Sequence, residues 1–313
     1  MTNIGESGAE SVSGLAQICS TLIEQARLRN FLDHLRARGC KESTVEDNRK
    51  SHGAVARGLA ELTTNEFDVE NISGVELRAW RSRLIGLGVK PTTLNHRFCF
   101  LRAYVRWAVG CGVVASRVAT ILDGLVDVPQ QQLAPRGLDE NETRRLLAMV
   151  ERGGNLRDRA IFALLFTGLR VSEVAGLRVS DLRVYQSKGS VLIQGEHVKG
   201  TKYREVPIGA EARRAVLAYL SFKRPTSAVF VGKRGPLSPN GIYKLFLGYC
   251  EAAGIDATPH TCRHTFAKRY LAATQNDLVG LSQALGHSNV NVTARYARRS
   301  LADLQAGIER CEI

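Results

Sequence analysis

The sequence predicts a mainly α-helical protein of two domains, the second of which includes a small antiparallel β-sheet. Three observations lead to this fold class. Apolar residues recur at helical spacing in both halves, an aperiodic segment rich in proline and glutamine separates the halves, and a short turn joins two β-rich runs in the second half. With 313 residues, 44% of them hydrophobic, the chain is long enough to form two domains with a core each.

The first half is expected to be flexible at its start and helical from there on. Residues 1–20 are rich in serine and glycine, which predicts weak order. Residues 21–120 are expected to form a small all-α domain with four main helical patterns. The first ends at Gly39, the second starts at Ser43, the third runs from Ser73 to Gly86, and the fourth starts at Pro91.

The helix expected from Pro91 has two chemically different faces. One face is apolar, with Leu94, Phe98, Leu101, Val105 and Ala108. The other face carries three arginines that are candidates for DNA contacts, namely Arg97, Arg102 and Arg106.

The second half is expected to form another domain over residues 138–300, after a linker over residues 121–137. Residues 191–198 and 203–208 predict two strands of a hairpin, with Lys199 and Lys202 in the turn between them. Residues of the N-cap type predict helix starts at Asp139, Ser238 and Thr258, and further helices are expected over residues 155–166 and 211–222.

Charge and cysteine usage indicate the kind of partner and compartment. The net charge is +13, and residues 138–313 contribute most of it, with 26 Lys+Arg against 16 Asp+Glu. Such an excess attracts polyanions, of which DNA is the commonest. The seven cysteines form no Cys-x-x-Cys pair, which favours a reducing cytoplasm over a disulfide framework. No apolar run predicts a membrane span, and residues 1–10 do not have the pattern of a secretion signal.

Four short segments of the second half contain chemically capable side chains. They are Thr-Gly-Leu-Arg-Val-Ser-Glu ending at Glu173, the turn with Lys199, His-Thr-Cys-Arg-His starting at His260, and Leu-Gly-His at His287 followed by Tyr296. Each has a plain structural explanation when it is considered singly. His260 and His264 also have the i,i+4 spacing of zinc ligands, but no third ligand stands at a suitable distance in the sequence.

Considered together, these residue types suit the cleavage of a phosphodiester. Two guanidiniums can neutralise the charge that develops on the non-bridging oxygens in the transition state. A phenol is a capable nucleophile once its proton is removed, and the leaving sugar oxygen needs a general acid such as lysine. Arg170 and Arg263 supply the guanidiniums, Tyr296 the phenol and Lys199 the acid.

The order of these segments and the residues in them resemble those of the tyrosine recombinase (phage integrase) family, in its simple Xer-like two-domain form. The resemblance covers about residues 22–300 and rests on Thr-Gly-Leu-Arg-x-Ser-Glu, Lys-Gly-x-Lys-x-Arg-x-x-Pro, His-x-x-Arg-His-Thr-Phe-Ala and Leu-Gly-His…Tyr. It implies a helical, SAM-like core-binding domain over 21–120 and a catalytic domain over 138–300. Cys262 stands where leucine is more usual in the family.

The resemblance implies a role for each matching residue, in a reaction that needs no metal and no other cofactor. Tyr296 attacks the phosphate and forms a 3′-phosphotyrosine, while Arg170 and Arg263 bind the non-bridging oxygens. Lys199 protonates the 5′-oxygen, His260 helps to activate the tyrosine, and His287 donates a hydrogen bond to the phosphate. Glu173 steadies Arg170, and Lys202 is expected to contact DNA.

The implied partner is double-stranded DNA with specific core sites, in the cytoplasm at the bacterial nucleoid. The implied assembly is a homo-tetramer in the synaptic complex, with a related recombinase as an alternative partner. Residues 301–313 carry an apolar stripe, Leu301, Leu304 and Ile308, which fits either packing on the same domain or exchange between protomers. Integration, excision and resolution of DNA all fit. A type IB topoisomerase, a non-catalytic DNA-binding regulator and a metal nuclease are the alternatives.

Overall fold

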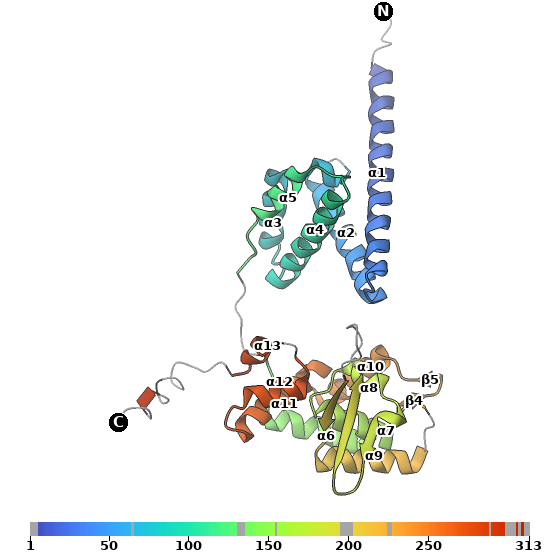
Figure 1. Ribbon diagram of the computed structural model, residues 1–313, viewed down its shortest axis with the longest axis vertical. Coiled ribbons are helices and arrows are strands. Elements are labelled where there is room, and N and C mark those ends of the chain that lie inside the picture. The colour runs from blue at the N-terminus through green and yellow to red at the C-terminus, as the bar shows by residue number, and fades with distance from the viewer. Residues whose placement is uncertain are drawn as a thin grey trace, which may run out of the picture. The chain divides into compact units, whose positions relative to one another are not determined.

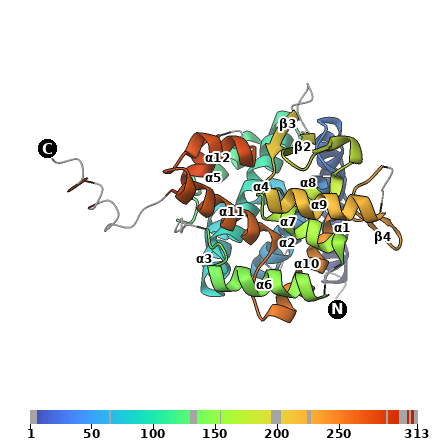
Figure 2. The same cartoon turned by 90° about the horizontal axis from the view of Figure 1, so that it is seen from below.

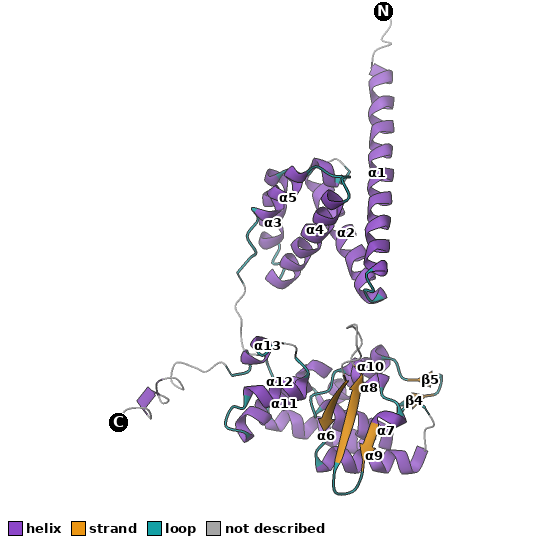
Figure 3. Cartoon of the chain, in the orientation of Figure 1, coloured by secondary structure: helices purple, strands orange, loops and turns teal. Residues whose placement is uncertain are grey.

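The computed structural model describes residues 6–63, 66–129, 135–153, 155–194, 203–223, 227–287, 289–297, 305 and 308–309. The chain forms two compact units, Met1–Gln131 and Gln132–Ile313, and each is described by itself (Figure 1). The described residues are mainly helical, with small antiparallel sheets in the second unit (Figure 3), which confirms the predicted fold class.

The first unit is entirely helical in its described residues. Its elements are α1 (Glu6–Ala37), α2 (Glu42–Thr63), the short 3-10 helix η1 (Val69–Asn71), α3 (Gly74–Gly86), α4 (Pro91–Gly110) and α5 (Ser116–Asp123). The predicted start at Ser73 is confirmed by a capping box, in which Ser73 Oγ accepts from the Glu76 amide and the Glu76 carboxylate accepts from the Ser73 amide.

Two features of the first unit differ from the sequence-based expectations. Residues 6–20, expected to be flexible, are the N-terminal part of α1. Leu122 and Leu125, at the start of the predicted linker, are buried in the core of the first unit. Serine and glycine lower helix propensity but do not prevent a helix from continuing, and the burial of Leu122 and Leu125 depends on tertiary packing that composition does not indicate.

The core of the first unit encloses a buried carboxylate. Glu24 of α1 accepts hydrogen bonds from the Tyr104 hydroxyl at 2.8 Å and from His52 Nε2, which lies 2.9 Å away. A salt bridge of 3.7 Å joins Glu24 to Arg27. These contacts connect α1 to α2 and α4, and burial, followed by the charge of Glu24, raises the pKa of Tyr104.

Two of the three arginines of α4, Arg102 and Arg106, make polar contacts within the first unit. Arg102 donates to the carbonyl oxygens of Leu122 and Leu125 and pairs with Asp127 at 2.8 Å, and Arg106 pairs with Asp123 at 2.8 Å. Arg102 therefore attaches α4 to the segment that follows it.

The second unit places helices around a three-stranded sheet. Its helices are α6 (Glu140–Gly153), α7 (Leu156–Leu165), α8 (Val171–Gly176), the 3-10 helix η2 (Val179–Asp181), α9 (Ala210–Lys223), α10 (Pro239–Ala253), α11 (Pro259–Ala273), α12 (Leu278–Leu285) and α13 (Asn291–Ala294). The first sheet has the order β1 (Leu182–Val184), β2 (Gly189–Gln194) and β3 (Tyr203–Pro207), and a second pairs β4 (Val231–Gly232) with β5 (Gly235–Pro236).

The predicted hairpin corresponds to β2 and β3. They pair antiparallel, and Gln194 lies opposite Tyr203, while residues 195–198 of the predicted first strand lie outside the described residues. Lys199 and Lys202 lie outside the described residues, as does most of the segment 301–313.

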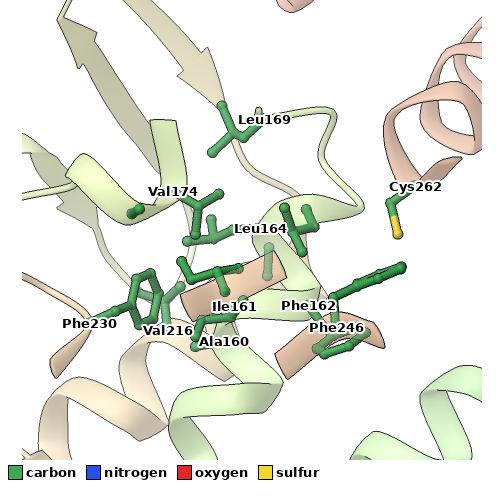
Figure 4. Close-up of a cluster of buried hydrophobic side chains, with 14 of the residues drawn as sticks. Ala160, Ile161, Phe162, Leu164, Leu169, Val174, Val216, Phe230, Phe246 and Cys262 are labelled. Atoms are coloured by element: carbon green, nitrogen blue, oxygen red, sulfur yellow. The ribbon is translucent and has the colours of Figure 1, made fainter. Parts of the chain in front are cut away.

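A hydrophobic core holds the helices and the sheet of the second unit together. Phe162 of α7 stacks on Phe246 of α10 at 5.2 Å between ring centroids, and Cys262 of α11 lies in the same buried cluster (Figure 4). Helix α9 packs along α7 (Figure 2). The core thereby fixes the end of α7, the start of α8 and the start of α11, where the candidate residues lie.

In the described part of the chain, no helix is both long enough and apolar enough to cross a membrane.

Candidate active site

The candidate site begins at the turn between α7 and α8. Gly168 has φ +86°, and a Cβ atom there would lie 2.6 Å from the ring of Phe266, so the close turn requires glycine. Arg170 follows as the N-cap of α8, and its amide and its Nη1 each donate to the Glu173 carboxylate at 2.8 Å. Glu173 thus holds both the backbone and the guanidinium of Arg170, the arrangement expected from the sequence.

A second arginine shares the same carboxylate. Arg204 of β3 donates from Nη1 and Nη2 to the two oxygens of Glu173, at 2.9 and 3.0 Å. Burial alone would raise the pKa of Glu173, but the hydrogen bonds and charges of the two arginines outweigh it and lower that pKa. Glu173 is therefore a carboxylate that links β3 to the start of α8.

Arg263 of α11 is a buried cation held by backbone carbonyls. It is 3% exposed, and it donates to the carbonyl oxygen of Gly168 at 2.6 Å and of Leu285 at 2.8 Å. Burial, and then the charge of Arg170, lowers the pKa of Arg263 to about 10, so the group remains a cation at neutral pH. Among the ion pairs of the described residues none involves Arg263. A buried cation without a carboxylate partner favours the binding of an anion.

His287 lies against Arg263. The Leu-Gly-His segment ends α12 with Gly286 at φ +66°, and this left-handed turn brings His287 Nε2 to 3.0 Å from Arg263 Nη2. An arginine can only donate, so Nε2 is the acceptor, and Nδ1 then carries the proton that points to Thr293 Oγ1 at 2.8 Å. Burial, followed by the charges of Arg263 and Arg170, lowers the pKa of His287 to about 4.

Tyr296 is buried against α11 and α12. It is 7% exposed and packs with Ala267, Leu271, Leu281 and Leu285. Its hydroxyl lies 2.8 Å from Nδ1 of His264. The Arg295 guanidinium lies 5.5 Å from the centroid of the phenol ring.

His260 is an exposed residue at the start of α11, one turn before His264. The two imidazole rings stack with their centroids 6.2 Å apart. His260 is exposed as a residue, but partial desolvation of its ring, followed by the charges of Arg263 and Arg170, lowers the pKa of His260. No group of three or more His, Cys, Asp or Glu side chains is placed to hold a metal ion within the described ranges.

The structure therefore brings together five of the six predicted catalytic residues. The charges of Arg170 and Arg263 act on each other and on both His260 and His287, and Tyr296 joins them through its interactions with Arg263 and His264. The sixth, Lys199, lies outside the described residues.

Sequence reasoning did not assign a role in the site to Arg204, His264 or Thr293. Arg204 stands in the motif Lys-Gly-x-Lys-x-Arg-x-x-Pro and His264 in His-x-x-Arg-His, so both belong to segments already singled out. Their positions within these motifs could have indicated a role in the site. The contact partner of each depends on the tertiary structure.

Known proteins match this chain both in sequence and in fold. Residues 136–302 match the phage integrase family. The tyrosine recombinase XerD of Lacticaseibacillus casei is 36% identical over 230 residues, which cover 69% of this chain and 75% of that protein.

Two solved structures share the fold at lower sequence identity. The Tn1549 transposon integrase in complex with a circular intermediate DNA superposes with a TM-score of 0.68 at 20% identity, covering 91% of this chain and 99% of that one. A λ integrase tetramer bound to a Holliday junction gives a TM-score of 0.66 at 19% identity, covering 85% and 77%.

The fold and the clustered arginine, histidine and tyrosine side chains define an enzyme of the tyrosine recombinase class. The chain belongs to the phage integrase family.

Proposed function

We propose that this recombinase cleaves one DNA strand at a specific site through Tyr296, forms a 3′-phosphotyrosine and passes the strand to a new 5′-hydroxyl. The observation that carries the proposal is the buried Arg263, a cation that donates to carbonyl oxygens, contacts His287 and interacts electrostatically with Arg170 and Tyr296. A phosphodiester supplies the anion that this cation otherwise lacks.

The two arginines divide the binding of the phosphate between them. Glu173 fixes Arg170, and the carbonyl oxygens of Gly168 and Leu285 fix Arg263, so neither guanidinium has to reorganise when charge develops on the non-bridging oxygens. His287 has both ring nitrogens occupied, by Arg263 and Thr293. Its proposed donation to the phosphate therefore requires the phosphate to replace one of these partners.

Lys199 is proposed as the general acid for the 5′-oxygen. The segment that contains it starts after Gln194 and returns at Tyr203, and Arg204 contacts Glu173 inside the site. Lys199 precedes Arg204 by five positions, so the chain length keeps the Cα atom of Lys199 within about 17 Å of that of Arg204. This reach supports the assignment.

The proposed partner is a DNA duplex with specific core sites, bound by a homo-tetramer or together with a related recombinase. The net charge of +13 and the fold shared with the λ integrase tetramer on a Holliday junction support it. Arg97, Arg102, Arg106 and Lys202 are the proposed DNA contacts, and residues 301–313 are proposed to exchange between protomers.

The experiment is to trap a covalent protein–DNA adduct on a nicked duplex that contains the recombination site. We expect Tyr296→Phe to bind this DNA as the unmodified protein does and to give no adduct. An adduct with Tyr296→Phe excludes the proposal.

Assays of the same purified protein distinguish a recombinase from the three alternative classes of protein. Full activity in EDTA is expected, whereas a metal nuclease loses activity with a chelator. A type IB topoisomerase relaxes any supercoiled plasmid, while this enzyme is expected to need its sites. A DNA-binding regulator gives no adduct at all.

A further inference from the structure

We propose that His264, and not the predicted His260, is the general base that takes the proton of Tyr296. The inference rests on the proposed function, in which Tyr296 is the nucleophile. It assigns the proton-accepting atom, Nδ1 of His264.

The geometry places His264 in direct contact with the reacting oxygen. Nδ1 of His264 lies 2.8 Å from the Tyr296 hydroxyl, within the range in which a general base removes a proton. Within the described part of the chain, this imidazole is the hydrogen-bond partner of that hydroxyl. His260 lies one helical turn away, with its ring 6.2 Å from that of His264, and its side chain is exposed.

The surroundings keep the imidazole of His264 neutral. Burial is the main cause that lowers its pKa to about 4, and the positive charges of Arg295, Arg263 and Lys268, together with His260, act in the same direction. In the proposed step the neutral imidazole is the tautomer that carries its proton on Nε2, in which Nδ1 accepts and the phenol O–H donates. His264 is thereby available as an acceptor throughout the neutral pH range.

The packing around Tyr296 holds the phenol in this orientation. The ring lies in an apolar cluster with Leu281 and Leu285, and the Arg295 guanidinium lies 5.5 Å from its centroid. The ring centroids of His264 and Tyr296 are 5.5 Å apart. The contact therefore joins two side chains that neighbouring atoms already confine.

In the proposed cleavage step the phenol loses one proton and the leaving 5′-oxygen gains a different one. As the phenol oxygen bonds to phosphorus, its proton passes to Nδ1 of His264 and the bond from phosphorus to the 5′-oxygen breaks. That oxygen takes a different proton, from the general acid proposed to be Lys199. In rejoining, the imidazolium returns its proton to the phenol oxygen while the lysine removes the proton of the attacking 5′-hydroxyl.

The positive surroundings lower the basicity of His264 in cleavage and favour the return of its proton in rejoining. An imidazolium beside Arg295 and Arg263 is acidic, so it returns its proton readily when the tyrosine becomes the leaving group. The same group can therefore serve cleavage and rejoining without an exchange of protons with water.

The test measures the single-turnover rate of adduct formation on a nicked duplex that contains the recombination site. We expect His264→Ala to lower this rate by about 100-fold, the usual contribution of a general base, with DNA affinity unchanged. His264→Asn keeps an acceptor atom near the position of Nδ1 but cannot take a proton, so we expect a similar loss. Arg269→Ala, an exposed position on the same helix, is the matched control and should retain the rate.

Two further measurements separate a base from a merely structural role. Added imidazole is expected to restore part of the rate of His264→Ala. A substrate with sulfur in place of the bridging 5′-oxygen needs no general acid, so it should rescue Lys199→Ala and leave His264→Ala slow.

The outcomes also separate this inference from the proposed function. A rate of His264→Asn close to that of the unmodified protein, or rescue of His264→Ala by the sulfur substrate, overturns the assignment of the base. In either case the adduct of the unmodified protein still supports Tyr296 as the nucleophile. Absence of any adduct with the unmodified protein contradicts the proposed function itself.

Discussion

Arg204 donates hydrogen bonds from both terminal nitrogens to the carboxylate of Glu173, at 2.9 and 3.0 Å, and Arg170 donates to the same carboxylate at 2.8 Å. One acidic side chain thus serves an arginine that is proposed to bind the phosphate and an arginine on the strand that leads out of the Lys199 segment. Two parts of the site that lie more than 30 residues apart in the chain are fixed by the same group.

Loss of the contact between Arg204 and Glu173 should slow adduct formation more than it weakens DNA binding. Arg204→Met keeps much of the side-chain volume but leaves Glu173 with Arg170 as its charged partner. We expect a loss of about 2 kcal/mol in the free energy of unfolding of the second unit, typical of hydrogen bonds between charged groups. Adduct formation should slow at least tenfold, and the two effects can be measured by circular dichroism and by the nicked-duplex assay. A variant as stable and as fast as the unmodified protein contradicts the positioning role of Arg204.

The turn at Gly286 should not tolerate a side chain. A Cβ atom there would lie 2.6 Å from Nη1 of Arg204, and φ is +66°. Gly254 is the matched control, because its φ is +63° but a Cβ atom would meet nothing within 4 Å. We expect Gly254→Ala to cost about 1 kcal/mol from backbone strain alone and Gly286→Ala to cost more and to abolish adduct formation. Equal losses of stability and activity in the two variants would show that the contact with Arg204 has no effect.

The buried carboxylate of the first unit should be essential to its stability. Glu24→Ala leaves the Tyr104 hydroxyl, His52 and Arg27 without their shared acceptor, and we expect a loss of about 3 kcal/mol, as when one partner of a buried charge pair is removed. Both tryptophans of the chain, Trp80 and Trp107, lie in this unit, so tryptophan fluorescence during denaturation reports on it alone. Tyr104→Phe removes one hydrogen bond and should cost about 1 kcal/mol. A larger loss from Tyr104→Phe than from Glu24→Ala contradicts the central place of the carboxylate.

The second unit should lose stability as the pH falls from about 6.5 to about 4. The folded-state pKa values of His264 and His287 are both lowered to about 4, whereas an imidazole in the unfolded chain titrates near about 6.5. Between these values the unfolded state binds more protons, so the free energy of unfolding decreases with decreasing pH and is fully retained above pH 6.5. Urea titrations at pH 7 and pH 5 measure the difference, and the double variant His264→Asn, His287→Asn should show a smaller one. An unchanged difference in the double variant contradicts this prediction.

Local sequence signals predicted the helices well, because the groups that start a helix are adjacent in sequence. Ser73 and Ser238 each cap the helix that follows, as expected. Strand β1, with three residues, is too short to show a period, and its pairing with β2 depends on residues further along the chain. The helix over residues 6–20 was missed because serine and glycine indicate turns and flexible segments in most contexts.

The sequence predicted which segments meet at the site, but not which atoms touch. His260 and His264 lie one turn apart on α11, and nothing in a linear pattern tells which of them faces a tyrosine 32 residues later. The same holds for Arg204, whose motif is visible in the sequence but whose carboxylate partner is 31 residues earlier. Tertiary packing decides such contacts.

In the proposed reaction the phenol oxygen of Tyr296 becomes linked to the 3′-phosphate of the cut strand. This linkage can be located by mass spectrometry of the peptide that remains attached to DNA after the adduct on a nicked duplex is digested with protease. We expect a nucleotide linked to the tyrosine of the peptide that contains Tyr296. A nucleotide linked to any other residue would contradict the proposed reaction.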